Sequence, residues 1–235
     1  MESARDPEPD TAPDRNGFSG KPLVASRSFL WSYVAAIVLA AAAAFLVRIH
    51  IVEAYRIPTD FMSPTLLSGD HIFVDKMAYR RWKLFGPSAL PARGDIVVFS
   101  FPSQPKKDFI KRVIAVPGDQ VSIADGAVTV NGAKITSREP SPTGEDEVEE
   151  SIGGHNYRVS WLKDSAQPRK MPPVQVPAGQ VFVLGDNRSQ GQDSRNWGFV
   201  PAKFMKGRAS VIWFSSGKSA KGKGIRWQRI FRRVE

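Results

Sequence analysis

The chain has 235 residues, a length that holds one or two modest domains. Its formal net charge of +10 indicates a partner with an acidic surface, either nucleic acid or anionic lipid. The absence of cysteine excludes disulfide bonds and thiolate metal sites. The histidines, His50, His71 and His155, are scattered without metal-ligand spacing, so we expect no metal ion and no cofactor.

An uncharged run at residues 29–47 follows an N-terminal segment, residues 1–28, that we expect to be disordered. The run is long enough to span a bilayer as a helix, and Trp31 and Tyr33 suit a membrane interface. We therefore expect a transmembrane anchor over residues 29–47. The alternative is a cleaved signal peptide with small residues at 40–44, although the acidic leader suits that poorly. Basic residues are nearly balanced on the two sides, so charge does not decide the orientation.

After the anchor, short β-rich runs alternate with turn signals. The Asp-Gly and Asn-Gly dipeptides at 125–126 and 131–132 lie between such runs and are typical of β-hairpins. Apart from a short turn within residues 201–205, no helix is indicated. We predict a mainly β, antiparallel domain over residues 51–215. The expected strands lie within residues 70–77, 94–101, 109–116, 120–123, 181–184 and 209–214.

Residues 57–70, IPTDFMSPTLLSGD, contain two prolines. Pro58 and Pro64 bias the residues before them toward extended backbone. We therefore expect an extended edge that presents alternate side chains, including Phe61 and Ser63, on one side. Such an edge would suit a binding or catalytic rim, and the alternative is an ordinary Pro-rich connection.

Two further segments are strongly charged. Residues 139–150 are rich in acids, and we expect an acidic, solvated loop within the β domain. Residues 216–235 form a basic tail in which Lys and Arg alternate with large apolar residues, a pattern that fits an anionic membrane surface. A frayed, solvated end is the alternative, and nucleic acid is disfavoured because the anchor is near. The tail residues expected at lipid are Trp227, Ile230 and Phe231 in the headgroup region, and Arg226, Arg229, Arg232 and Arg233 on anionic lipid.

Four segments occur in a specific order: residues 57–70, RGD at 93–95, KRVIAVPGD at 111–119, and GDNRSQGQDSRNWG at 185–198. Together they resemble the bacterial type I signal peptidases. The resemblance implies a mainly β, antiparallel signal-peptidase-like domain behind one N-terminal transmembrane helix. It also implies a location at the outer face of the cytoplasmic membrane. The implied partners are the signal peptides of secreted preproteins.

The chemistry of this family is a Ser–Lys dyad, in which a serine hydroxyl attacks the scissile carbonyl and a neutral lysine takes its proton. Lys111, which by itself would be interpreted as a solvated strand lysine, matches the general base. Phe109 and Val113 would share its strand face as an apolar wall. The nucleophile position is Phe61, so the dyad cannot acylate. We expect the Phe61 ring to contact Lys111 and to hold it protonated through a cation–π interaction.

Other positions also depart from the family or match it. Thr59 matches the oxyanion-hole position, whereas the carboxylate of Asp60, in place of glycine, would oppose a developing oxyanion. Gly191 replaces a serine that bonds the lysine. Ser63 is a minor alternative nucleophile, because its hydroxyl would be displaced by roughly 6–7 Å. The supporting residues of the family are matched by Met62 and Pro64, and by Arg112, Asp193 and Arg195 as a salt-bridge cluster.

These features leave three functional hypotheses. The first is a membrane-bound endopeptidase with an unusual nucleophile. The second is a non-catalytic paralogue that binds secretory segments, or another exported partner, without cutting them. The third is a structural β domain docked on lipid.

Overall fold

The structure is a computed structural model that describes residues 27–79, 90–137, 146–162, 165, 167–219 and 222–234. The chain divides into two compact units, residues 1–43 and 44–235, and each is described by itself. All but the last two residues of the segment expected to be disordered, residues 1–28, lie outside the described residues.

Helix α1, Arg27–His50, covers the uncharged run at residues 29–47. Its central residues are mostly alanine, the residue with the highest helix propensity, and its first turn has no acidic side chain. None of the helices within the described ranges has the combined length and hydropathy of a membrane span. The helix expected here is present, and its role as an anchor remains a prediction from the sequence.

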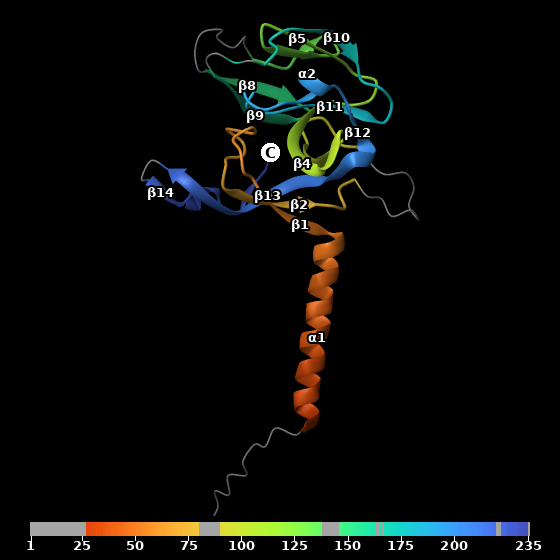
Figure 1. Cartoon of the computed structure of the whole chain (residues 1–235), viewed down its shortest axis with the longest axis vertical. Coiled ribbons are helices and arrows are strands. Elements are labelled where there is room, and N and C mark those ends of the chain that lie inside the picture. Colours follow the sequence, from red (N-terminus) through yellow and green to blue (C-terminus); the bar gives the residue numbers. More distant parts are fainter. Residues whose placement is uncertain are drawn as a thin grey trace, which may run out of the picture. The chain divides into compact units, whose positions relative to one another are not determined.

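The largest sheet of the described residues has nine strands, and its path runs β1-β2-β13-β3-β4-β11-β12 (Figure 1). Strands β14 and β15 also pair with β13. The pairings are antiparallel, as the sequence predicted. The strands are β1 Val52–Arg56, β2 Asp70–Asp75, β3 Ile96–Phe101, β4 Gln104–Ala115, β11 Gln180–Leu184, β12 Val200–Pro201, β13 Met205–Ser219, β14 Gly222–Ile225 and β15 Arg232–Arg233.

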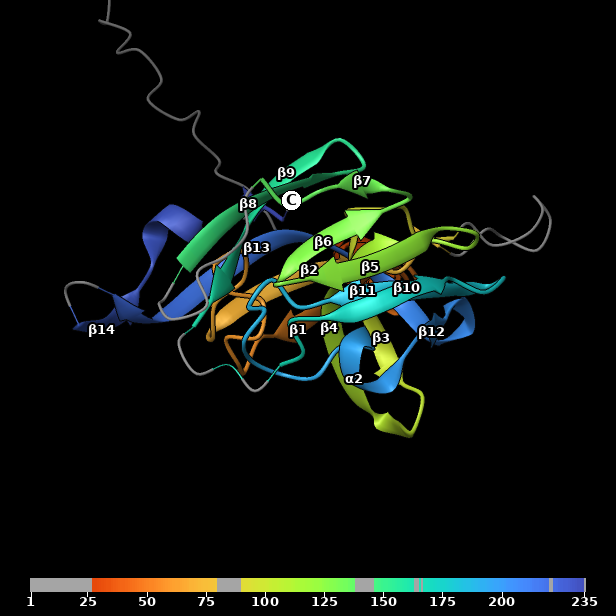
Figure 2. The same cartoon turned by 90° about the horizontal axis from the view of Figure 1, so that it is seen from above.

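A smaller sheet and a hairpin complete the domain. The small sheet runs β10-β5-β6-β7, and β8 pairs with β9 in a separate hairpin (Figure 2). Asp125 and Asn131 both have positive φ, and each is followed by a positive-φ glycine, which confirms the two hairpin turns. The remaining elements are β5 Gln120–Ala124, β6 Ala127–Val130, β7 Ala133–Lys134, β8 Asp146–Ile152, β9 His155–Trp161, β10 Met171–Gln175, α2 Ser194–Trp197, η2 Ala202–Phe204 and η3 Trp227–Arg229.

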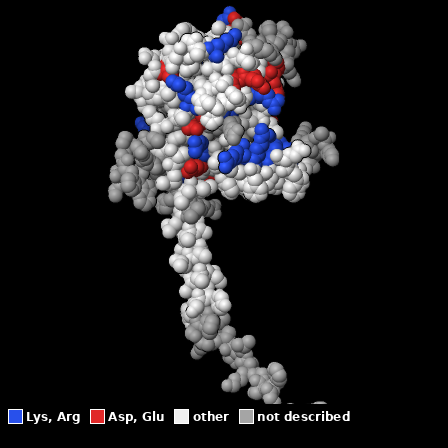
Figure 3. Space-filling view, turned by 180° about the vertical axis from the view of Figure 1, so that it is seen from behind, with Lys and Arg blue, Asp and Glu red and all other residues white. Residues whose placement is uncertain are grey.

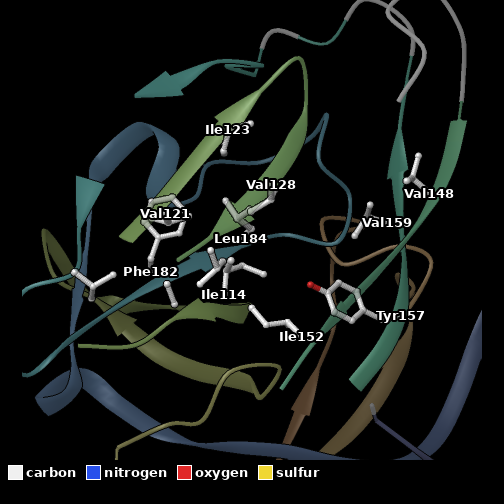
Figure 4. Packing of buried hydrophobic residues seen from close by; sticks show 13 residues of the cluster. Ile114, Val121, Ile123, Val128, Val148, Ile152, Tyr157, Val159, Phe182 and Leu184 are labelled. Carbon is white, nitrogen blue, oxygen red and sulfur yellow. The ribbon is translucent and has the colours of Figure 1, made fainter. Parts of the chain in front are cut away.

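Buried side chains pack between the sheets. One cluster joins β4 and β11 of the large sheet to the small sheet and to the β8–β9 hairpin, with Ile114, Leu184 and Val128 at its centre (Figure 4). Tyr157 of β9 belongs to this cluster. A second cluster packs residues of the 57–70 turn against β2, β3 and β13. The turn is therefore fixed to the large sheet by apolar burial.

The structure corrects two expected boundaries. Of the acidic segment 139–150, residues 146–150 belong to strand β8, and the residues before 146 lie outside the described ranges. Alternate side chains of β8 are buried, so most of its acids face solvent while Glu150 faces inward. The basic tail does not begin a separate segment at residue 216, because β13 continues to Ser219 and β14, η3 and β15 follow it.

Candidate functional site

The 57–70 segment is a compact turn, and the expected extended edge is wrong. The Ser63 amide donates to the Asp60 carbonyl at 3.0 Å, and the Leu66 amide donates to the Met62 carbonyl at 2.8 Å. The side chains of Met62 and Leu66 are almost fully buried. Burial of these two apolar side chains, together with the turn hydrogen bonds, outweighs the extended preference that the prolines impose.

Lys111 lies on β4 and is completely buried. Its neighbour along the ladder is Val97 of β3, and its Nζ has no hydrogen-bond partner among the described residues. Burial lowers the pKa of Lys111 to about 8, while Asp193 raises it and Arg195 lowers it further. A lysine of this kind can become neutral near the pH at which a general base works.

The Phe61 ring lies against Lys111, which confirms the expected contact. Lys111 Nζ is 5.3 Å from the centre of the ring. The ring also meets Gly191, where an added Cβ would lie 2.7 Å from Phe61 Cγ. Gly191 has a φ of +74°, which glycine adopts most readily. A serine at this position would therefore clash with the ring, so Phe61 and Gly191 are sterically matched.

The electrostatic effect of this contact stays a prediction. A cation–π interaction with the Phe61 ring would favour the protonated form of Lys111. Burial acts in the opposite direction, because removal of the ammonium group from water is the largest influence on the pKa of Lys111 and lowers it to about 8.

The polar side chains of the turn, Thr59, Asp60 and Ser63, have surroundings that differ from those of Lys111. Asp60 Oδ1 accepts a 2.7 Å hydrogen bond from the Ser68 amide, so its carboxylate caps the turn. Thr59 is exposed. Ser63 lines a cavity of about 1020 Å³ together with Arg56 and Asp60. Lys111 is not part of the lining of this cavity. The structure thus brings Phe61 and Gly191 to Lys111 and places Ser63 in a cavity without the base.

Two buried ion pairs lie close enough to Lys111 for their charges to influence it. Arg112 donates to both carboxylate oxygens of Asp186, at 2.9 and 2.8 Å. Arg195 donates to both oxygens of Asp193, at 2.8 Å each. Although burial raises the pKa of Asp193, its pKa lies below the ordinary value because of the bonds from Arg195. The expected single cluster is therefore two bidentate pairs, and Asp186 is the partner that the sequence analysis missed.

Further polar contacts support the site. Buried Glu150 forms an ion pair with Arg188 of the 185–198 segment and accepts a hydrogen bond from the Tyr157 hydroxyl. Strand periodicity in 146–152 could have placed Glu150 inward, but only the fold shows its partner. Pro64 lines a cavity of about 910 Å³ beside the turn. Within the described residues, no cluster of three or more His, Asp or Glu side chains is placed to hold a metal ion.

The C-terminal segment is bound to the turn, which corrects part of the expected lipid surface. Arg226 and Arg229 both contact buried Asp70, with Nη2 to carboxylate distances of 3.2 and 2.6 Å. Their side chains are only 11 and 12% exposed, so they are not free to meet lipid. Trp227 and Phe231, in contrast, are 73 and 78% exposed.

The sequence of the chain matches a known family and several known proteins. A family described as "Signal peptidase, peptidase S26" matches residues 30–214. Signal peptidase I of Pseudomonas fluorescens is 35% identical over 191 residues, which cover 72% of this chain and 66% of that protein. Signal peptidase I of Aquifex aeolicus is 32% identical over 211 residues, which cover 74% of this chain and 80% of that protein. The chain therefore belongs to the signal peptidase S26 family.

Among solved structures, a signal peptidase I from Enterococcus faecalis V583 is 26% identical. The match covers 51% of this chain and 97% of that chain, with a TM-score of 0.34.

Proposed function

We propose that this chain binds the signal peptides of secreted preproteins and does not cleave them through a Ser–Lys dyad. The observation that carries the proposal is the Phe61 ring, which lies 5.3 Å from Lys111 Nζ at the position of the family's nucleophile. Covalent catalysis needs an oxygen or another nucleophilic atom within hydrogen-bond reach of the base. A phenyl ring has none, whereas the surrounding framework of buried ion pairs is complete.

A second candidate function, cleavage with a relocated nucleophile, is favoured by one specific observation. Lys111 is buried, its Nζ has no hydrogen-bond partner among the described residues, and its pKa is lowered to about 8. These are the properties that a general base requires. Ser63 is the alternative nucleophile in this case, although its cavity is not lined by Lys111.

The test is to mix the full chain, in a nonionic detergent, with a secreted preprotein, and to follow both complex formation and cleavage. A matched control preprotein carries bulky charged residues instead of small ones before the cleavage site. Selective binding of the first preprotein, without cleavage, is the expected result. Cleavage that disappears in Lys111→Ala or Ser63→Ala would overturn the proposal in favour of a relocated nucleophile. If the chain neither binds nor cleaves the preprotein, the proposal is overturned and the third hypothesis, a structural β domain docked on lipid, remains.

The proposed location is the bacterial cytoplasmic membrane, with residues 29–47 as a retained single-pass anchor and the β domain on the outer side. The uncharged sequence of this run and the helix that covers it support the location. N-terminal sequencing of membrane-extracted protein should find residues before 29. A mature N-terminus after residue 44 would contradict a retained anchor, and protease added from outside should digest the β domain.

A further inference from the structure

A cavity of about 910 Å³ lies beside the 57–70 turn, and neither Phe61 nor Lys111 is part of its lining. Its walls come from β7 and the residues after it, from the β8–β9 hairpin, from Pro64 and Thr65 of the turn, and from β15. This volume is in the range of sites for small ligands. Its lining is rich in hydroxyl and amide groups, including Ser137, Ser151 and Asn156, so it suits a polar ligand.

The charge of the lining selects for an anion. The cationic side chains that line the cavity are Lys134, Arg158, Arg232 and Arg233. Arg232 and Arg233 are exposed and form no ion pair within the described part of the chain. On the face shown in Figure 3, Lys and Arg side chains gather in a patch, with acidic side chains higher on the same face.

The acidic residues of the lining do not cancel this charge. Glu150 is buried and already bound by Arg188, and it also accepts hydrogen bonds from Thr136 and Tyr157. Its charge is therefore compensated inside the protein. Glu149 remains as an exposed carboxylate of the lining. Arg158 pairs with Glu147, but both side chains are at least half exposed, so this pair is weak.

The two arginines are presented by an ordered strand and not by a frayed end. β15 pairs with β13, with Arg233 opposite Val211 and Arg232 opposite Ile212. The segment before it is tied to buried Asp70 by Arg226 and Arg229. Because the backbone of these arginines is already ordered, only their side-chain rotamers have to be fixed when they bind a ligand.

From these observations we infer that the cavity is a binding site for a phosphate-bearing polar ligand, either a soluble phosphate ester or the headgroup of an anionic phospholipid. Arginine suits this ligand because its guanidinium donates two parallel hydrogen bonds to phosphate oxygens. The hydroxyl and amide groups of the lining would bind the polar remainder of the ligand. Since Pro64 and Thr65 line the same cavity, the ligand contacts the turn that carries Phe61.

The test measures binding to the full chain in a nonionic detergent by isothermal titration calorimetry. The three titrants are inorganic phosphate, glycerol 3-phosphate, and dihexanoylphosphatidylglycerol below its micelle concentration. The variant is Arg232→Gln/Arg233→Gln. The matched control is Lys106→Gln/Lys107→Gln, which removes the same charge from exposed positions outside the cavity lining.

We expect saturable binding that weakens by at least about tenfold in the arginine variant, as for the loss of a charged hydrogen bond, and is unchanged in the control. Binding of inorganic phosphate or glycerol 3-phosphate identifies a soluble phosphate as the source, and binding of the phospholipid alone identifies the headgroup. No saturable binding of any titrant would overturn the inference. An equal loss in the lysine control would also overturn it, because the interaction would then depend on net charge only.

Discussion

Two segments meet at Lys111, and different interactions fix the parts that lie close to it. The 185–198 segment is held by buried ion pairs, in which Arg112 binds Asp186 and Arg195 binds Asp193. We call these four ion-paired residues the rear wall. The 57–70 turn contributes the Phe61 ring, and this part of the turn is fixed by apolar packing and by hydrogen bonds within the turn.

Because of this difference, the residues that stabilise the fold near Lys111 are not the residues that would carry out cleavage. Removal of one partner of a buried ion pair leaves an uncompensated charge, so the rear wall tolerates little change. A side chain on the turn can change with a small structural cost, provided that the residue it meets changes as well. Phe61 and Gly191 are such a matched pair. Loss of cleavage, as we propose for this chain, therefore requires a change at this pair and no change in the ion pairs.

The largest expected effect is a gain of cleavage in Phe61→Ser/Gly191→Ser. The first change supplies a hydroxyl near Lys111 and removes the ring that a serine at 191 would meet at 2.7 Å. Asp60 is kept, because its carboxylate caps the Ser68 amide. We expect cleavage of a preprotein to rise from undetectable to measurable. The added Lys111→Ala change should then lower the rate by about 100-fold or more, the usual contribution of a general base.

The gain of cleavage in this double variant also tests the comparison between the rear wall and the 57–70 turn. If the rear wall is intact and only the turn has lost its chemistry, changes on the turn and at its matched residue are sufficient. A double variant that remains folded, binds the preprotein and still cuts nothing would show that the rear wall has lost its function too.

The next effect is on stability, in Asp186→Ala. This change leaves the fully buried Arg112 without its bidentate partner. We expect the free energy of unfolding to fall by about 3–5 kcal/mol, as for other broken buried pairs. Urea unfolding followed by circular dichroism measures it. The control is Glu147→Ala, which breaks the exposed pair with Arg158 and should cost less than about 1 kcal/mol.

A third effect is a pH-dependent stabilisation by Lys111→Met. The pKa of Lys111 is lowered from 10.5 to about 8 by burial, so between these pH values the unfolded chain binds more protons than the folded one. The wild-type protein should therefore gain stability as the pH rises from 8 toward 10.5, and it should be least stable below pH 8. Removal of the amine should stabilise the fold by up to roughly 3 kcal/mol at pH 7, and this advantage should shrink above pH 8.

Unfolding curves of the wild type and Lys111→Met, measured from pH 6 to 9.5, test the direction in which the stability difference changes with pH. Lys107→Met is the matched control, because it makes the same substitution at an exposed position of the same strand and removes no buried amine. A Lys111→Met protein that is less stable than the wild type at pH 7 would show that the Phe61 ring stabilises the ammonium group more than burial opposes it.

The smallest effect is that of Gly191→Ala. Its Cβ would meet the Phe61 ring, and φ of +74° is unfavourable for alanine. We expect a loss of about 1–3 kcal/mol in the free energy of unfolding. In a Phe61→Ala background the same change should cost less, because only the backbone strain remains. Equal costs in both backgrounds would show that the ring and Gly191 are not coupled.

Much of the domain could be predicted from the sequence. The β-rich runs gave the positions of β2, β3, β4, β5, β11 and β13, because strand propensity and turn dipeptides act over a few neighbouring residues. The same local rule failed at residues 57–70, where the prolines predicted extended backbone. Burial of Met62 and Leu66 against the large sheet decides that conformation, and this depends on residues far away in the chain.

For the candidate site, too, some features follow from the sequence and others only from the tertiary structure. The sequence by itself determined the family, because this depends on residue identity within continuous motifs. The base position at Lys111 and the missing nucleophile at Phe61 stay predictions from the same motifs. Only the tertiary structure decided that Arg112 pairs with Asp186, that Gly191 accommodates the ring, and that Arg226 and Arg229 bind Asp70. It also decided that burial lowers the pKa of Lys111. Each of these depends on which distant segments exclude water from one another, and a sequence pattern specifies the segments but not their partners.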